Sequence, residues 1–260
     1  MLRVVLALAC LVASEVRGAD DPYPWIAAAY VVKRDGALLW AGQPDARLPP
    51  ASLAKLMTAL LALERGRLDE PVTVGKGVLR STGTRMGLKP GEKLRAGDLL
   101  AASVVRSAND ACRALADHLD EKSFVEKMNA RAATLGLANT HFVDPCGHDR
   151  AGQYASAADL ARLAEEVTKH GEYMRLAGLE KISFKTLDGA RSFTLRNTNA
   201  LLGRYPGAIG LKTGYTEGAG NCLVALAERD GVRVLAVLLN APNRWWNAVG
   251  LLDRAFDAPR

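Results

Sequence analysis

Residues 49–58 read Pro-Pro-Ala-Ser-Leu-Ala-Lys-Leu-Met-Thr, with a serine and a lysine three positions apart at the head of an apolar run. Pro49 and Pro50 suit the approach to a helix that they cannot extend backward. The apolar spacing from about residue 51 predicts a buried helix. Because residues i and i+3 share a helix face, we expect the amine of Lys55 to lie beside the hydroxyl of Ser52.

This pair has the chemistry of an activated nucleophile. A serine hydroxyl is a weak nucleophile at neutral pH and needs an adjacent base. Lys55 can serve as that base only if burial or a neighbouring cation lowers its pKa, and the apolar run supplies burial. Ser-x-x-Lys is common by chance, and a capped helix with a partly exposed lysine is the alternative, so the prediction depends on further motifs.

Two such motifs follow along the chain. Ser107-Ala108-Asn109 is expected in a short loop between two helices, where it can present a hydroxyl and an amide to a cleft. Lys212-Thr213-Gly214 is expected on a strand that turns its cation and hydroxyl toward an anionic group, and glycine allows close approach of a ligand. Each motif alone is ordinary, because serine, asparagine and glycine all suit turns.

In this order, Ser-x-x-Lys, Ser-x-Asn and Lys-Thr-Gly form the motif set of penicillin-recognising serine enzymes. The sequence closely resembles the D-alanyl-D-alanine carboxypeptidases, the low-molecular-mass penicillin-binding proteins, over about residues 25–256. Further blocks that carry the resemblance are residues 87–92 (Gly-Leu-Lys-Pro-Gly-Glu), 107–111 and 210–216. The resemblance implies acyl transfer at a serine, with peptidoglycan stem peptides as substrates and β-lactam antibiotics as covalent inhibitors.

The resemblance also implies a role for each catalytic residue. Ser52 would attack the carbonyl between two D-alanines and form an acyl-enzyme, and Lys55 would take its proton. Ser107 would relay a proton to the leaving amine, while Asn109 would hold Lys55 and the substrate amide.

The third motif would bind the other end of the substrate. Lys212 and Thr213 would hold its terminal carboxylate, and Lys212 would help to keep Lys55 neutral. The oxyanion hole would use backbone N–H groups of Ser52 and of the residue about two after Gly214. No metal or cofactor is required, and the four histidines show no ligand spacing and are expected to be structural or at the surface: His118, His141, His148 and His170.

Strand patterns stand at both chain ends, with helical patterns between them. These patterns predict an α/β fold with an antiparallel sheet from both chain ends, flanked by helices, with an inserted helical region. The resemblance implies that this fold is of the β-lactamase and DD-peptidase type. The predicted hairpins cover residues 26–41 and 182–195, the strands 71–74, 221–226 and 232–239, and irregular loop 77–97. One predicted helix is introduced by residues 94–98 and ends at residue 105. Four further helices are predicted over residues 110–119, 122–135, 155–170 and 245–256.

The ends of the chain suggest export. Residues 1–18 resemble a secretory signal, with Arg3 before a short apolar run and cleavage after Gly18, and lipidation at Cys10 is a weaker option. Residues 19–260 are expected to form a single catalytic domain with no C-terminal β domain and no membrane anchor. The expected location is soluble and periplasmic or extracellular. The formal net charge of +6 is scattered, which argues against a nucleic-acid partner.

Three cysteines follow the signal segment. Cys222 reads as a buried strand residue, so Cys112 and Cys146 are the more plausible pair for a disulfide, which export permits.

There are three alternatives to a carboxypeptidase. A class A β-lactamase needs a glutamate to activate the deacylating water, and no glutamate between Asn109 and Lys212 has asparagine four residues later. A silent peptidoglycan-binding relative is disfavoured because Ser52, Lys55 and Lys212 are all present. The choice between carboxypeptidase and endopeptidase on cross-links stays open.

Overall fold

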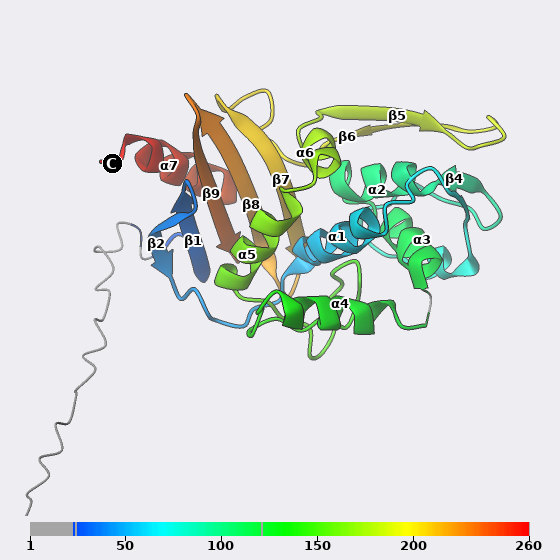
Figure 1. Ribbon diagram of the computed structural model, residues 1–260, viewed down its shortest axis with the longest axis horizontal. Coiled ribbons are helices and arrows are strands. Elements are labelled where there is room, and N and C mark those ends of the chain that lie inside the picture. The colour runs from blue at the N-terminus through cyan, green and yellow to red at the C-terminus, as the bar shows by residue number, and fades with distance from the viewer. Residues whose placement is uncertain (1–22, 24, 121, 260) are drawn as a thin grey trace, which may run out of the picture.

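A five-stranded antiparallel sheet brings the two ends of the chain together, in the order β2-β1-β9-β8-β7 (Figure 1). The computed structural model describes residues 23, 25–120 and 122–259, and the predicted signal segment lies outside them. The strands are β1 (Ala29–Arg34), β2 (Ala37–Gly42), β7 (Ala208–Thr216), β8 (Gly220–Arg229) and β9 (Val232–Leu239). The predicted fold class is confirmed, and β7 forms one edge of the sheet.

Two tight turns fix the register of this sheet. Asp35 and Gly36 join β1 to β2 with φ angles of 50° and 84°. Asp230 and Gly231 join β8 to β9 with φ angles of 50° and 76°. Positive φ at both central residues is what two-residue hairpin turns require, and Asp-Gly is a favoured pair for it. Both predicted turns are therefore confirmed.

The sheet buries alternate residues on its two faces. Along β9, the residues Val234, Ala236 and Leu238 pack with helix α7 (Arg244–Asp257). Their neighbours Leu235, Val237 and Leu239 belong to a larger core shared with the helical region. Each fully buried aliphatic side chain stabilises the fold by about 1.5–3 kcal/mol. The sheet is thus held from both sides, as Figure 1 shows for α7 and α5.

The helical region lies between β2 and β7 in the sequence. It contains the 3₁₀ helix η1 (Ala51–Ala54) and the helices α1 (Lys55–Arg65), α2 (Ala96–Val105), α3 (Asn109–Asp120), α4 (Phe124–Thr134), α5 (Ala157–Val167) and α6 (Gly171–Ala177). Helix α1 is buried along most of its length, as its apolar run predicts. At the start of α5 the hydroxyl of Ser156 accepts a hydrogen bond from Asp159 N at 3.2 Å. The predicted helices are therefore present, although η1 shortens the first one.

Some short elements differ from the prediction. The sequence predicts irregular loop over 77–97, but 3₁₀ helix η2 (Lys76–Arg80) and strand β4 (Lys93–Arg95) lie there, and β4 pairs with β3 (Pro71–Thr73). Three residues are too few to establish a strand period. Helix α6 is also absent from the prediction, whereas the second hairpin is present as β5 (Lys181–Lys185) and β6 (Ser192–Arg196). Within the described ranges, no helix has the length and apolarity needed to cross a membrane.

A disulfide joins Cys112 on α3 to Cys146 in the loop that precedes α5, as the sequence predicts. The two Cα atoms are 5.8 Å apart, and both side chains are buried. Cys222 on β8 is a buried free thiol. The bond joins α3 to the loop that precedes α5, across 34 residues of sequence.

We predict that this disulfide forms under oxidising conditions and contributes to the stability of the protein. Closing a loop of 34 residues restricts the unfolded chain by about 4 kcal/mol in the loop-entropy description. Urea unfolding of the Cys112→Ala/Cys146→Ala double variant should show a loss of this order. Mass spectrometry without reduction should find the two peptides linked, and two free thiols would contradict the prediction.

Candidate active site

The three sequence motifs meet in one cleft of about 710 Å³ at the edge of the sheet. Ser52 lies on η1, Ser107 in the loop between α2 and α3, and Thr213 on the edge strand β7. All three line the cleft, together with Asn109 and Gly214. Lys55 begins α1 and Lys212 lies on β7, with side chains only 1% and 2% exposed. The structure thus brings together all seven residues that the sequence singled out.

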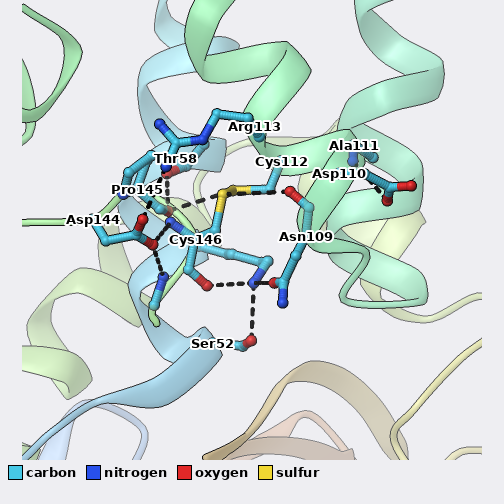
Figure 2. Close-up of a disulfide and its surroundings, with 12 residues drawn as sticks. Ser52, Thr58, Asn109, Asp110, Ala111, Cys112, Arg113, Asp144, Pro145 and Cys146 are labelled. Atoms are coloured by element: carbon cyan, nitrogen blue, oxygen red, sulfur yellow. Dashed lines mark hydrogen bonds and ion pairs between the residues drawn. A yellow bond between two sulfur atoms is a disulfide. The ribbon is translucent and has the colours of Figure 1, made fainter. Parts of the chain in front are cut away.

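The amine of Lys55 is surrounded by three oxygen atoms. Its Nζ lies 2.9 Å from Ser52 Oγ and 2.7 Å from Asn109 Oδ1, and it also bonds to the carbonyl oxygen of Cys146. Figure 2 shows these contacts beside the disulfide, with Ser52 and Asn109 labelled around the amine. Asn109 is fixed in turn, because its Nδ2 donates to Thr82 O at 2.6 Å.

Burial sets the protonation of Lys55. Removing the ammonium from water lowers the pKa of Lys55 to about 7, although the negative charge of Asp144 opposes the shift. Asp144 is held in its charged form: burial would raise its pKa, but hydrogen bonds and charge from His148 keep that pKa below its usual range. A lysine with this pKa is substantially neutral at physiological pH, and only a neutral amine can accept a proton.

Lys212 is a second buried amine in the same site. Its Nζ donates to Ser107 Oγ at 2.7 Å and to Thr213 O at 2.9 Å. Burial, then the charges of Lys55 and Arg244, lower the pKa of Lys212 well below its ordinary value. The pKa of Lys55 itself is set by its burial and by the charge of Asp144, so the predicted help from Lys212 in keeping Lys55 neutral stays a prediction. The Thr213 hydroxyl meets that of Thr198 at 2.6 Å.

Arg244, the first residue of α7, is a cleft residue that the sequence reasoning missed. Its Nη1 donates to Gly214 O at 2.6 Å, and in the described part of the chain its Nε is buried without a hydrogen-bond partner. Burial lowers the pKa of Arg244, as it does for Lys212. An arginine about 30 residues beyond the last motif gives no sequence signal, because only folding of α7 onto the sheet brings it there.

Other polar groups hold the walls of the cleft. The carboxylate of Asp110 accepts hydrogen bonds from the backbone N atoms of Met86, Gly87 and Leu88 at 2.8–3.0 Å. This fixes the preceding loop, whose residues 82–84 line the cleft. The sequence prediction treats this segment as irregular and so misses its contribution. His148, predicted to be structural or exposed, lines the cleft as well and bonds to Asp144 through Nδ1 at 3.0 Å.

Backbone constraints place the two serines. Ala51, just before Ser52, and Ser107 itself have positive φ angles of 48° and 60°, a conformation that costs residues with side chains about 1–3 kcal/mol each. Glycines allow the neighbouring segments to approach. A Cβ on Gly147 would lie 1.9 Å from Ala51 O, and a Cβ on Gly214 would lie 3.2 Å from Ser52 N. The edge strand thus runs directly beside the backbone N–H of Ser52.

The residue types in the cleft do not form a metal centre. Across residues 23, 25–120 and 122–259, no group of three or more histidine, cysteine, aspartate or glutamate side chains is arranged to hold a metal ion. The chemistry of the cleft is that of hydroxyls, two amines, a guanidinium and amides. Such a set suits nucleophilic attack on a carbonyl whose neighbour carries negative charge.

Comparison with known proteins agrees with this geometry. Residues 24–243 match the family model described as D-alanyl-D-alanine carboxypeptidase. The chain is 36% identical over 239 residues to D-alanyl-D-alanine carboxypeptidase DacF of Bacillus subtilis, covering 88% of this chain but 61% of that protein. This chain therefore spans about three-fifths of the length of that relative.

Solved structures show the same fold. The DD-transpeptidase of Streptomyces K15 superposes with a TM-score of 0.86 at 30% identity, covering 92% of this chain and 100% of that one. Penicillin-binding protein D2 of Listeria monocytogenes, in its ampicillin-bound form, gives a TM-score of 0.78 at 33% identity, covering 88% and 97%. With a family model matched from residue 24 to residue 243 and the motifs gathered in one cleft, the chain belongs to the D-alanyl-D-alanine carboxypeptidase family.

Proposed function

We propose that this protein is a serine-type D-alanyl-D-alanine carboxypeptidase that trims peptidoglycan stem peptides through an acyl-enzyme on Ser52. The observation that carries the proposal is the environment of the Lys55 amine. Asn109 Oδ1 and Cys146 O can only accept hydrogen bonds, so they take the two N–H groups of neutral Lys55. The remaining tetrahedral direction, that of the lone pair, is left for the Ser52 hydroxyl at 2.9 Å.

The reaction then follows from these positions. The Ser52 proton passes to Lys55 Nζ while Oγ bonds to the carbonyl carbon between the two D-alanines. The C–N bond breaks, and the leaving D-alanine takes a proton from the hydroxyl of Ser107, which regains one from protonated Lys55, so that both side chains return to their starting forms. Lys212 donates to Ser107 Oγ, so the hydroxyl hydrogen of Ser107 points away from Lys212. That hydrogen is therefore available to the leaving amine. Water then hydrolyses the ester and regenerates Ser52.

The terminal carboxylate of the substrate supplies a negative charge that suits this end of the cleft. Burial lowers the pKa values of both Lys212 and Arg244, and the charges of Lys55 and Arg244 lower the pKa of Lys212 further. A carboxylate bound there would favour the charged form of Lys212 and would pair with the guanidinium of Arg244, which lines the cleft. The hydroxyls of Thr213 and Thr198 lie on the same wall. This combination favours a substrate that ends in a free carboxylate.

The setting of the reaction is also part of the proposal. A disulfide next to the cleft fits an oxidising, exported environment, where peptidoglycan is the substrate. The ampicillin-bound state of the Listeria relative supports β-lactams as covalent inhibitors of this chain. The backbone N–H of Ser52 beside β7 supports an oxyanion hole formed with an N–H of that strand.

We predict that Ser52→Ala abolishes both covalent labelling and hydrolysis. Wild-type protein should retain a fluorescent penicillin through denaturing electrophoresis and should release one D-alanine from a pentapeptide. Ser52→Ala should do neither, since it removes the hydroxyl that is bonded to Lys55. Ser183→Ala, on the exposed hairpin strand β5, is the matched control and should behave like wild type. Equal labelling of Ser52→Ala would refute the assignment of the nucleophile.

The products identify the acceptor of the acyl group. Mass spectrometry of muropeptides after incubation should show tetrapeptides and free D-alanine if water is the acceptor. Cleavage of cross-linked dimers would indicate endopeptidase action. New cross-linked dimers would indicate transfer to an amine, the reaction for which the Streptomyces K15 DD-transpeptidase is named.

A second prediction concerns Lys55→Arg, which should fail nearly as completely as Lys55→Ala. Arginine keeps the positive charge but is never deprotonated in proteins, so it cannot accept the Ser52 proton. The acylation rate should fall on the order of 10²–10⁴-fold, the usual contribution of a general base. Lys181→Arg on β5 is the matched control. Near-normal acylation of Lys55→Arg would mean that Lys55 acts only as a cation.

A further inference from the structure

We propose that the Cys112–Cys146 disulfide is a positioning device for Lys55, because it fixes together the two oxygen atoms that aim the amine at Ser52. The inference rests on the proposed function, since it concerns the efficiency of the same base. It assigns to the bond a role in the rate of acylation, beyond its contribution to stability.

Each cysteine belongs to the segment that supplies one acceptor of Lys55. The carbonyl of Cys146 is itself one acceptor. Asn109, which supplies the other, begins α3, and Cys112 follows one turn later. Each sulfur contacts a backbone carbonyl oxygen of the opposite segment. Cys146 Sγ is 3.7 Å from Asn109 O, and Cys112 Sγ is 3.5 Å from Pro145 O. Figure 2 shows the bond lying between these two segments. One covalent link therefore sets the distance between both acceptors.

Opening the bond must disturb this arrangement. Both cysteines are almost completely buried, at 0% and 1% exposure, so the sulfurs cannot separate into solvent. In the disulfide the two sulfur atoms are joined by a covalent bond. In two thiols the sulfur atoms are not bonded and must lie farther apart, at van der Waals contact. In a close-packed interior that extra volume is gained only by moving the surrounding segments. The segments that move are the start of α3, which carries Asn109, and the loop of Cys146.

Other contacts keep the fold in place when the bond is absent. Arg113 Nη2 donates to Asp144 Oδ2 at 3.0 Å, joining the same helix to the same loop. Thr58 on α1 donates to Pro145 O at 2.6 Å. The carboxylate of Asp144 accepts from the backbone N of Cys146 at 2.8 Å. The loop is therefore held near its place by hydrogen bonds, while its fine position depends on the disulfide.

The consequence is a dependence of activity on the redox state. A dithiol reduces the bond by giving up two electrons and two protons, so that the S–S bond becomes two thiols and the dithiol becomes a cyclic disulfide. In the loosened site, the lone pair of Lys55 points less accurately at Ser52 and water reaches the amine. Misplacement of a catalytic group by about 1 Å can cost on the order of 10²-fold in rate. Hydration of the amine moves its pKa back toward the ordinary value for lysine.

The test uses the Cys112→Ala/Cys146→Ala double variant and the oxidised wild type. The rate of acylation by fluorescent penicillin is measured from about pH 5 to pH 9 and is expressed per folded protein, with the folded fraction taken from circular dichroism. In wild type the rate should rise with pH through the pKa of Lys55, about 7, because the neutral amine is the base. The double variant should acylate roughly 10- to 100-fold more slowly at neutral pH, with its midpoint at higher pH.

A matched control separates positioning from stability. Leu252→Ala opens a cavity between α7 and the sheet, away from Lys55, and should cost about 2–5 kcal/mol of stability. Its acylation rate per folded protein and its midpoint should equal those of wild type. Wild type refolded from denaturant in the presence of a dithiol, which reaches both cysteines in the unfolded chain, should reproduce the double variant, and reoxidation should restore the rate.

The outcomes are distinct. If the folded double variant has the rate and midpoint of wild type, the disulfide serves stability alone and the inference is wrong. The same conclusion follows if the lost activity only parallels the unfolded fraction. If oxidised wild type is itself not labelled at Ser52, the proposed function fails instead.

Discussion

The candidate active site is organised around one buried contact, that between the amine of Lys55 and its three oxygen partners. A charged lysine with 1% exposure would be costly in this interior, so burial moves its pKa to about 7 and makes the neutral form accessible. Two of its partners are fixed acceptors, and the third is the hydroxyl of Ser52. The same environment that favours the neutral amine also holds it beside the hydroxyl of Ser52.

The fold supplies each part of that contact from a different element. Helix α1 buries Lys55, α3 carries Asn109, the disulfide-linked loop presents the carbonyl of Cys146, and the edge strand β7 closes the opposite wall with Lys212. The sheet joins both ends of the chain, so β7 and α7 can be placed against a helical region that precedes them in the sequence. Strained backbone at Ala51 and Ser107 is the cost of this convergence.

Much of this could be predicted from sequence, because several signals are local. Ser52 and Lys55 share a helix face, Asp-Gly pairs mark the hairpin turns, and apolar runs mark β8 and β9. Arg244 and the carbonyl of Cys146 could not be predicted, since neither belongs to a motif: a carbonyl has no residue signature, and Arg244 reaches the cleft only through packing of α7. Strand β4 was missed because three residues show no period, and the place of His148 in the cleft was missed because its partner Asp144 is defined by the loop conformation.

Burial makes the neutral form of Lys55 accessible at physiological pH, and the pKa of its amine can be measured directly. Lysine ε-carbons labelled with ¹³C can be followed by NMR across the neutral and alkaline range in the oxidised protein. The Lys55→Arg variant identifies the relevant resonance by its absence. We expect a midpoint near 7, against the ordinary lysine value of 10.5. A midpoint above about 9 would lie close to the unperturbed range, and it would show that Lys55 stays protonated and is not the base.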